Sequence, residues 1–130
     1  MTDTEQRPTG INLHSRSRQL ALEYGSGESY SLSCEYLRVY SPSAEVRGHG
    51  PGREVLQTGK ARVNIKSIKP VGHYALQLVF DDGHDTGLYS WSYLYALCIN
   101  QEAWWQSYHD KLAAAGETRD PDVQVIQFDP

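Results

Sequence analysis

The chain has 130 residues, a formal net charge of −4, 39% hydrophobic residues and 11% aromatic residues. This length suits one domain with a modest core, and the composition excludes a disordered chain. No apolar run approaches the roughly 18 residues of a membrane-spanning helix, and the polar start from Met1 to Gly10 lacks the apolar centre of a signal peptide. We therefore expect a soluble, cytoplasmic protein that makes no membrane contact.

The two cysteines, Cys34 and Cys98, are far apart and have no CxxC spacing. This spacing encodes neither a disulfide framework nor a cysteine-based zinc site. We expect both thiols to be small buried hydrophobic groups.

Positive charge is concentrated in the middle of the chain, where residues 47–80 hold six basic residues and one acidic residue. Such a stretch could attract phosphates or an acidic partner. The basic residues are spread out and have no interleaved aromatics, so we favour a solvated face and do not expect nucleic-acid binding.

The first third of the chain predicts a hairpin followed by a short helix. Residues 1–12 show no periodicity and are predicted to be a flexible lead-in. Gln19 to Tyr24 alternates as a half-buried strand does, and Ser29 to Leu32 is the returning strand. Ser33 is placed to cap a helical turn over 34–38.

The middle third predicts a glycine-rich loop and a second hairpin. The loop spans 47–60, and strands follow over 63–71 and 73–80, with a bulge where Ile68 breaks the phase. A tight turn at 81–83 leads into a short strand over 84–88.

The last third is helical. Ser90 is a good N-cap, and the side chains that follow it recur at helical spacing. Asn100 is expected to cap a second helix that ends at Gly116. Residues 117–130 are predicted to be an acidic tail, in which 123–126 could be an edge strand or disordered.

Strands followed by helices predict an α+β fold, a small antiparallel sheet with C-terminal helices on one side, within a single domain over 13–116.

Two segments, 37–46 and 80–91, carry a more specific signal. Leu-Arg-x-x-Ser-Pro-Ser-Ala, with a later Asp-Asp-Gly-His and Tyr-Ser-Trp, resembles the N-terminal domain of gamma-butyrobetaine hydroxylase and the free-standing bacterial proteins of the DUF971 family. The resemblance covers roughly residues 12–99. In the hydroxylase-type members the pattern has three cysteines and one histidine that hold zinc.

The resemblance identifies four positions of a degenerate zinc site in this chain. Ser41, Ser43 and Val46 stand where the cysteines would be, and His84 stands where the histidine would be. A serine hydroxyl does not replace a thiolate, and the valine side chain has no donor. We therefore expect no metal and no cofactor, and a domain that folds without either.

His84 has two interpretations that the sequence leaves open. It could be a general base together with Asp85, with Asp82 or Ser43 nearby, in a small enzyme or ligand-binding protein. The interpretation that we favour is a structural histidine that hydrogen-bonds a backbone carbonyl or Asp85.

The favoured function is a non-catalytic accessory or protein-interaction domain with a protein partner. The resemblance implies such a role, because the family's domain is also found attached to hydroxylases and to ATPases of iron–sulfur cluster assembly. The enzyme hypothesis requires a concave pocket around His84, whereas the docking hypothesis predicts a flat, exposed patch. The candidate surface consists of Arg38, Tyr40, Ser41, Pro42, His49 and Tyr89.

Overall fold

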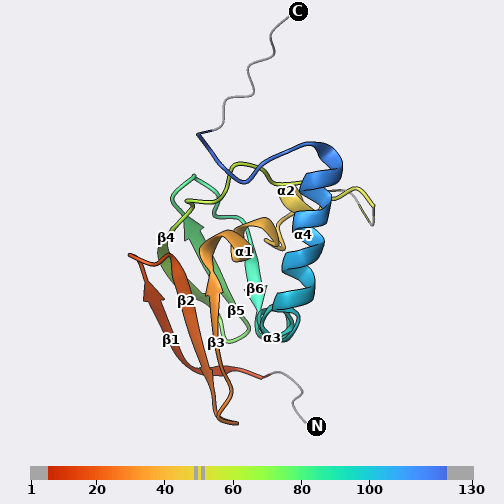
Figure 1. Ribbon diagram of the computed structural model, residues 1–130. Helices are drawn as coiled ribbons and strands as arrows, with labels where there is room; N and C mark the ends of the chain where they lie inside the picture. The colour runs from red at the N-terminus through yellow and green to blue at the C-terminus, as the bar shows by residue number, and fades with distance from the viewer. Residues whose placement is uncertain (1–5, 49, 51, 123–130) are drawn as a thin grey trace, which may run out of the picture.

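Six strands and four helices make up the described part of the chain, which in this computed structural model is residues 6–48, 50 and 52–122 (Figure 1). The strands are β1 (Pro8–His14), β2 (Gln19–Tyr24), β3 (Ser29–Ser33), β4 (Ile65–Val71), β5 (Ala75–Phe80) and β6 (Leu88–Ser90). The helices are α1 (Cys34–Val39), α2 (Ala44–Arg47), α3 (Trp91–Ile99) and α4 (Gln101–Ala115). The expected α+β class is confirmed, with two small sheets in place of one.

The first sheet has the order β1-β2-β3, and all its pairings are antiparallel. The predicted alternation of β2 is confirmed, since Leu20, Leu22 and Tyr24 are buried. The lead-in predicted over 1–12 is too long, because residues 8–12 lie in β1. An edge strand tolerates Pro8, and a register shift between Pro8 and Gly10 absorbs the irregularity.

The second sheet has the order β4-β5-β6 and is also antiparallel. The predicted bulge is present as a register shift between Ile65 and Ser67. The strand predicted over 84–88 is wrong, because β6 begins only at Leu88. Residues 84–87 are not paired in the sheet, since His84 and Gly87 are buried against the segment that follows α1.

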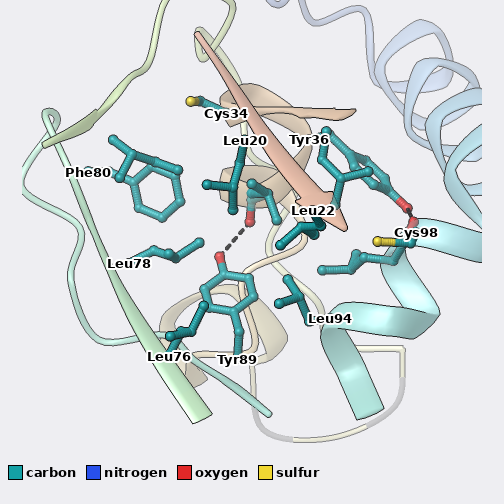
Figure 2. Close-up of a cluster of buried hydrophobic side chains, with 14 of the residues drawn as sticks. Leu20, Leu22, Cys34, Tyr36, Leu76, Leu78, Phe80, Tyr89, Leu94 and Cys98 are labelled. Carbon is teal, nitrogen blue, oxygen red and sulfur yellow. Dashed lines mark hydrogen bonds between the residues drawn. The ribbon is translucent and has the colours of Figure 1, made fainter. Parts of the chain in front are cut away.

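The main core lies between the two sheets and is closed by α1 and α3. Figure 2 shows leucines of β2 and leucines of β5 facing one another, with Tyr89 of β6 pointing in among them. Both thiols, Cys34 and Cys98, belong to this core, which confirms the expectation that they are buried.

Most of the helix caps are those predicted from the sequence. The Ser33 hydroxyl accepts a hydrogen bond from the Tyr36 amide at 3.0 Å, and the Ser90 hydroxyl accepts one from the Tyr93 amide at 3.2 Å. Gly116 ends α4 in the left-handed conformation at φ 68°. Asn100 precedes α4 but its side chain makes no cap bond, because its amide donates back to the Ala96 carbonyl.

The C-terminal helix α4 packs against α1 through a second apolar cluster of Val39, Tyr108 and Leu112. The chain then returns along residues 59–61, where the amides of Gly59 and Ala61 donate to the carbonyls of residues 118 and 119. The first part of the predicted tail is therefore packed on the domain, whereas 123–130, including the possible edge strand, lies outside the described residues. None of the described helices is long and apolar enough to cross a bilayer.

Candidate functional site

The four positions of the degenerate zinc pattern come from three segments, and three of them meet directly. His84 follows the turn after β5, while Ser41 and Ser43 lie between α1 and α2. The His84 Nε2 atom lies 2.8 Å from Ser41 Oγ and 3.4 Å from Ser43 Oγ. All three side chains are buried, as is Val46 in α2. We call Ser41, Ser43 and His84 the Ser–His cluster.

The histidine ring of this cluster is held in its neutral form. Burial, followed by the positive charge of Arg38, lowers the pKa of His84 below its usual value. The carboxylate of Glu45 opposes this shift, but its nearest oxygen is 3.9 Å from His84 Nδ1 and is exposed to solvent. In a neutral ring one nitrogen donates and the other accepts, so the tautomer decides whether Nε2 accepts the Ser41 hydroxyl proton or donates to the hydroxyl oxygen.

Asp82 joins the cluster to α1 and to the long loop before β4. One carboxylate oxygen accepts the His84 amide at 3.1 Å, and the other accepts Arg38 Nε at 2.9 Å and Lys60 Nζ at 2.7 Å. Burial raises the pKa of Asp82, but the bonds from Lys60, the His84 amide and Arg38 outweigh it and lower the pKa to about 2. Arg38 also donates to Gln57 at 3.0 Å, so it links three segments.

Ser41 is closely packed on the side of Gly87. A methyl group at position 87 would overlap the Ser41 hydroxyl, so Gly87 is required by the close approach of the two segments. Tyr89 is fully buried beside it and donates to the Leu37 carbonyl at 2.5 Å. Burial raises the pKa of the Tyr89 hydroxyl.

The candidate interaction surface predicted from the sequence is therefore wrong as an exposed patch. Arg38, Ser41 and Tyr89 are buried, because α1 is covered on all sides and β6 faces the core. Tyr40 and Pro42 are half-buried. The sixth position, His49, lies outside the described residues.

The catalytic pairing of His84 with Asp85 also finds no geometric support. Asp85 is exposed, and its backbone carbonyl accepts Gln77 Nε2 at 2.8 Å. The expected partner of the His84 ring, a backbone carbonyl or Asp85, is wrong, because Nε2 contacts the hydroxyls of Ser41 and Ser43.

The residues at the zinc-site positions do not fit a structural zinc ion. Two neutral hydroxyls and one imidazole supply no thiolate, and Val46 supplies no donor. Within residues 6–48, 50 and 52–122, no three His, Cys, Asp or Glu side chains gather where they could hold a metal.

A pocket of about 720 Å³ lies beside the Ser–His cluster, and Ser41 lines it. It opens between α2 with the following loop on one side and α3 with α4 on the other; α2 lies next to α4 in Figure 1. The Val55 amide donates to the Val46 carbonyl at 2.8 Å and holds this loop against α2. The aliphatic part of the lining is Val39, Val46, Val55 and Leu56.

The aromatic lining of the pocket consists of three tyrosines whose hydroxyls are already used. Tyr93 donates to the Tyr40 carbonyl at 2.6 Å, Tyr40 to the Trp104 carbonyl at 2.7 Å, and Tyr108 to the Gln57 carbonyl at 2.6 Å. These bonds fix the three rings and connect α1, α3, α4 and the loop. The rings therefore contribute rigid, mainly apolar walls.

Three charged side chains border the pocket: Arg47 of α2, Lys111 of α4 and Glu54 of the loop. The Arg47 guanidinium lies over the Tyr93 ring, 5.0 Å from its centre. Backbone amides of Glu54 and Gly52, followed by the charge of Lys111, lower the pKa of Glu54. The border is thus positive by one charge.

Sequence reasoning did not select most of this pocket. Val46 was singled out only as a former ligand position, and Val55 and Leu56 were placed in the glycine-rich loop over 47–60. Apolar side chains inside a glycine-rich loop were the available signal. Tyr93 and Lys111 carried no signal for a pocket, and the spacing of Tyr108 indicated only the apolar stripe of the second helix.

A family model and one solved structure point to the same family. The gamma-butyrobetaine hydroxylase-like N-terminal domain matches residues 11–95. A crystal structure of a DUF971-family protein of unknown function from Acidithiobacillus ferrooxidans is 38% identical, with a TM-score of 0.59, over 69% of this chain and 90% of its own. No curated protein gives a significant match.

Two solution NMR structures are similar over nearly their whole length. One is 49% identical over 95% of this chain and 98% of its own, with a TM-score of 0.81. The other is 50% identical over 100% of this chain and 99% of its own, with a TM-score of 0.76. Because these alignments cover 95% and 100% of this chain, the similarity includes α4, which lies outside residues 11–95.

Proposed function

The chain belongs to the gamma-butyrobetaine hydroxylase-like N-terminal family, and on that premise we propose that it is a non-catalytic interaction domain that binds a protein partner in the pocket between α2 and α4. The observation that carries this proposal is the pocket itself, with fixed aromatic walls, an aliphatic lining and a net positive border. It is concave, unlike the flat patch expected for docking, but neither His84 nor Asp85 lines it, whereas the enzyme hypothesis requires a pocket around His84. Such a lining suits binding by burial of apolar surface.

The Ser–His cluster acts as part of the scaffold rather than as a reaction centre. Ser41 is 1% exposed, and its hydroxyl is bonded to the imidazole. Among the described residues, every fully buried side-chain nitrogen or oxygen has a hydrogen-bond partner. A buried cluster whose hydroxyls and imidazole Nε2 bond to one another stabilises the fold.

In this proposal the Ser–His cluster and Val46 occupy the place of a zinc site and take over its cross-linking role. Hydrogen bonds join the segment after α1 to the turn after β5, where four metal bonds would do so in a zinc-binding member. Because these bonds need no deprotonated thiolate, the domain folds without metal.

The family resemblance suggests the kind of partner. Domains of this family accompany hydroxylases and ATPases of iron–sulfur cluster assembly, so an accessory role beside such a protein in the cytoplasm is consistent with the fold. Oxygenase activity does not transfer, because the hydroxylase's iron and 2-oxoglutarate site lies in a separate catalytic domain.

The test compares two exposed aliphatic residues. Val55 lines the pocket and is 52% exposed, whereas Ile99 at the end of α3 is absent from the pocket lining and is 56% exposed. Wild-type, Val55→Asn and Ile99→Asn proteins are used to capture partners from the native extract, and the captured partner is then purified and titrated against each protein.

The proposal expects wild type and Ile99→Asn to bind the purified partner equally and Val55→Asn to bind more weakly. Equal binding by all three proteins, or turnover of a substrate that Ser41→Ala abolishes, would overturn it.

A further inference from the structure

We infer that the pocket binds an extended peptide segment that places bulky apolar side chains between the tyrosine rings and carries acidic side chains beside them. This inference rests on the proposed function and specifies the chemistry of the partner. It follows from the saturation of the tyrosine hydroxyls, the charge of the border and the exposed apolar rim.

The walls select apolar groups because their polar atoms are already bonded. Tyr40, Tyr93 and Tyr108 each donate the hydroxyl proton to a backbone carbonyl at 2.6–2.7 Å. A ligand that competed for those protons would break bonds between α1, α3, α4 and the loop. The aliphatic side chains of Val46 and Val55 extend the same apolar surface.

The border selects negative charge. Arg47 of α2 and Lys111 of α4 both line the pocket, so an occupant lies near two cations. Glu54 offsets one of them, which leaves a net positive border in a chain whose formal charge is −4. Charge complementarity of this kind steers binding and fixes orientation.

The shape favours a peptide. The volume of about 720 Å³ leaves room for more than one large side chain. Val55 lines this pocket and is 52% exposed, so the apolar lining reaches the open surface. An occupant that covers both the hollow and the rim must continue along the surface, as a chain with successive side chains does.

The experiment uses blocked hexapeptides of the sequence Gly-X-Phe-Leu-X-Gly, in which X is Asp, Asn or Lys, and an Asp peptide with Ala-Ala in place of Phe-Leu. Binding is measured by amide chemical-shift titration of the full chain. The charge variant is Arg47→Ala/Lys111→Ala. Its matched control is Lys66→Ala/Lys69→Ala, which removes two exposed cations from β4.

We expect shifts at Val46, Val55 and Tyr93, with the Asp peptide binding about threefold to tenfold more tightly than the Asn peptide, as two exposed ion pairs would give. The Arg47→Ala/Lys111→Ala variant should lose this preference, and the β4 control should keep it. The Ala-Ala peptide should not shift the pocket amides.

Other outcomes separate this inference from the proposed function. Equal binding of the Asp, Asn and Lys peptides would overturn the acidic requirement, even if Val55→Asn weakened binding of the purified partner. If the peptides bound but Val55→Asn left the affinity for the purified partner unchanged, the proposed function would be overturned instead. A large gain in peptide affinity on deleting residues 123–130 would show that the chain's own segment occupies the pocket, which also overturns the inference.

Discussion

The Ser41 hydroxyl and the His84 imidazole lie 2.8 Å apart across 43 residues of sequence and form a buried cross-link between the segment after α1 and the turn after β5. Ser41 also lines the pocket. The same side chain therefore belongs both to the buried polar cluster and to the wall of the pocket.

If these positions are those of a former metal cage, restoring the thiolates should restore zinc binding. Tetrahedral zinc with bonds of about 2.0 to 2.3 Å places neighbouring donors roughly 3.3 to 3.8 Å apart, which is close to the spacing of the present Ser–His cluster. We expect Ser41→Cys/Ser43→Cys/Val46→Cys to bind one zinc ion per chain by elemental analysis, with a melting temperature that falls on adding EDTA.

Two controls accompany the zinc prediction. Wild-type protein should contain far less than one zinc per chain and should melt at the same temperature with and without EDTA. Adding His84→Ala to the triple variant should weaken zinc binding strongly. A triple variant that binds no zinc would show that the four positions do not converge as a cage.

Stability should fall in mildly acidic solution because of His84. Its pKa is lowered in the folded state, so the unfolded chain takes up a proton first as the pH falls through the ordinary value of 6.5. The stabilisation is complete above that value and is lost as the pH falls through the folded pKa. Urea unfolding at pH 7.5 and 5.5 should therefore show a smaller acid loss for His84→Gln than for wild type; equal losses would contradict the shift.

Removing the Tyr89 hydroxyl should destabilise the fold without leaving a cavity. The hydroxyl donates to the Leu37 carbonyl in the last turn of α1, where carbonyls have no helical partner. We expect Tyr89→Phe to lower the free energy of unfolding by about 1–3 kcal/mol, because a buried acceptor loses its donor. Tyr74, which is 57% exposed, offers the matched control. Tyr74→Phe should change the free energy of unfolding by less than about 0.5 kcal/mol.

The pair of Glu35 and Arg119 should show strong coupling. Glu35 is buried and receives two bonds, from Arg119 Nε at 2.8 Å and from Nη2 at 2.7 Å. Arg119→Ala should cost about 1–3 kcal/mol of unfolding free energy, since it leaves that carboxylate without its partner. The same substitution in a Glu35→Gln background should cost clearly less, and additive effects in the double-mutant cycle would argue against the pair.

Local patterns in the sequence were enough to predict much of the fold. Alternation indicated β2 and β5, and the serines before α1 and α3 were recognised as caps. What failed depended on distant contacts. Pro8 and Gly10 resemble chain breakers, yet β1 is an edge strand that accommodates both. Two separate sheets could not be foreseen, because periodicity does not say which strands pair.

In the candidate site, too, the sequence pattern predicted some features, and those that depend on distant contacts were missed. The family pattern brought Ser41, Ser43 and His84 to attention together, and the structure places them in contact. It gave no measure of burial, so Arg38 and Tyr89 were expected at the surface. Arg38 is buried because Asp82 and Gln57 lie against it, and both are far from it in sequence.

The bond between Glu35 and Arg119 has a consequence for the order in which the chain can fold. Arg119 follows every described strand and helix in the sequence, so its pair with the carboxylate in the first turn of α1 can form only after those elements have been synthesised. The partner of this buried acid therefore comes from a segment that is neither helix nor strand.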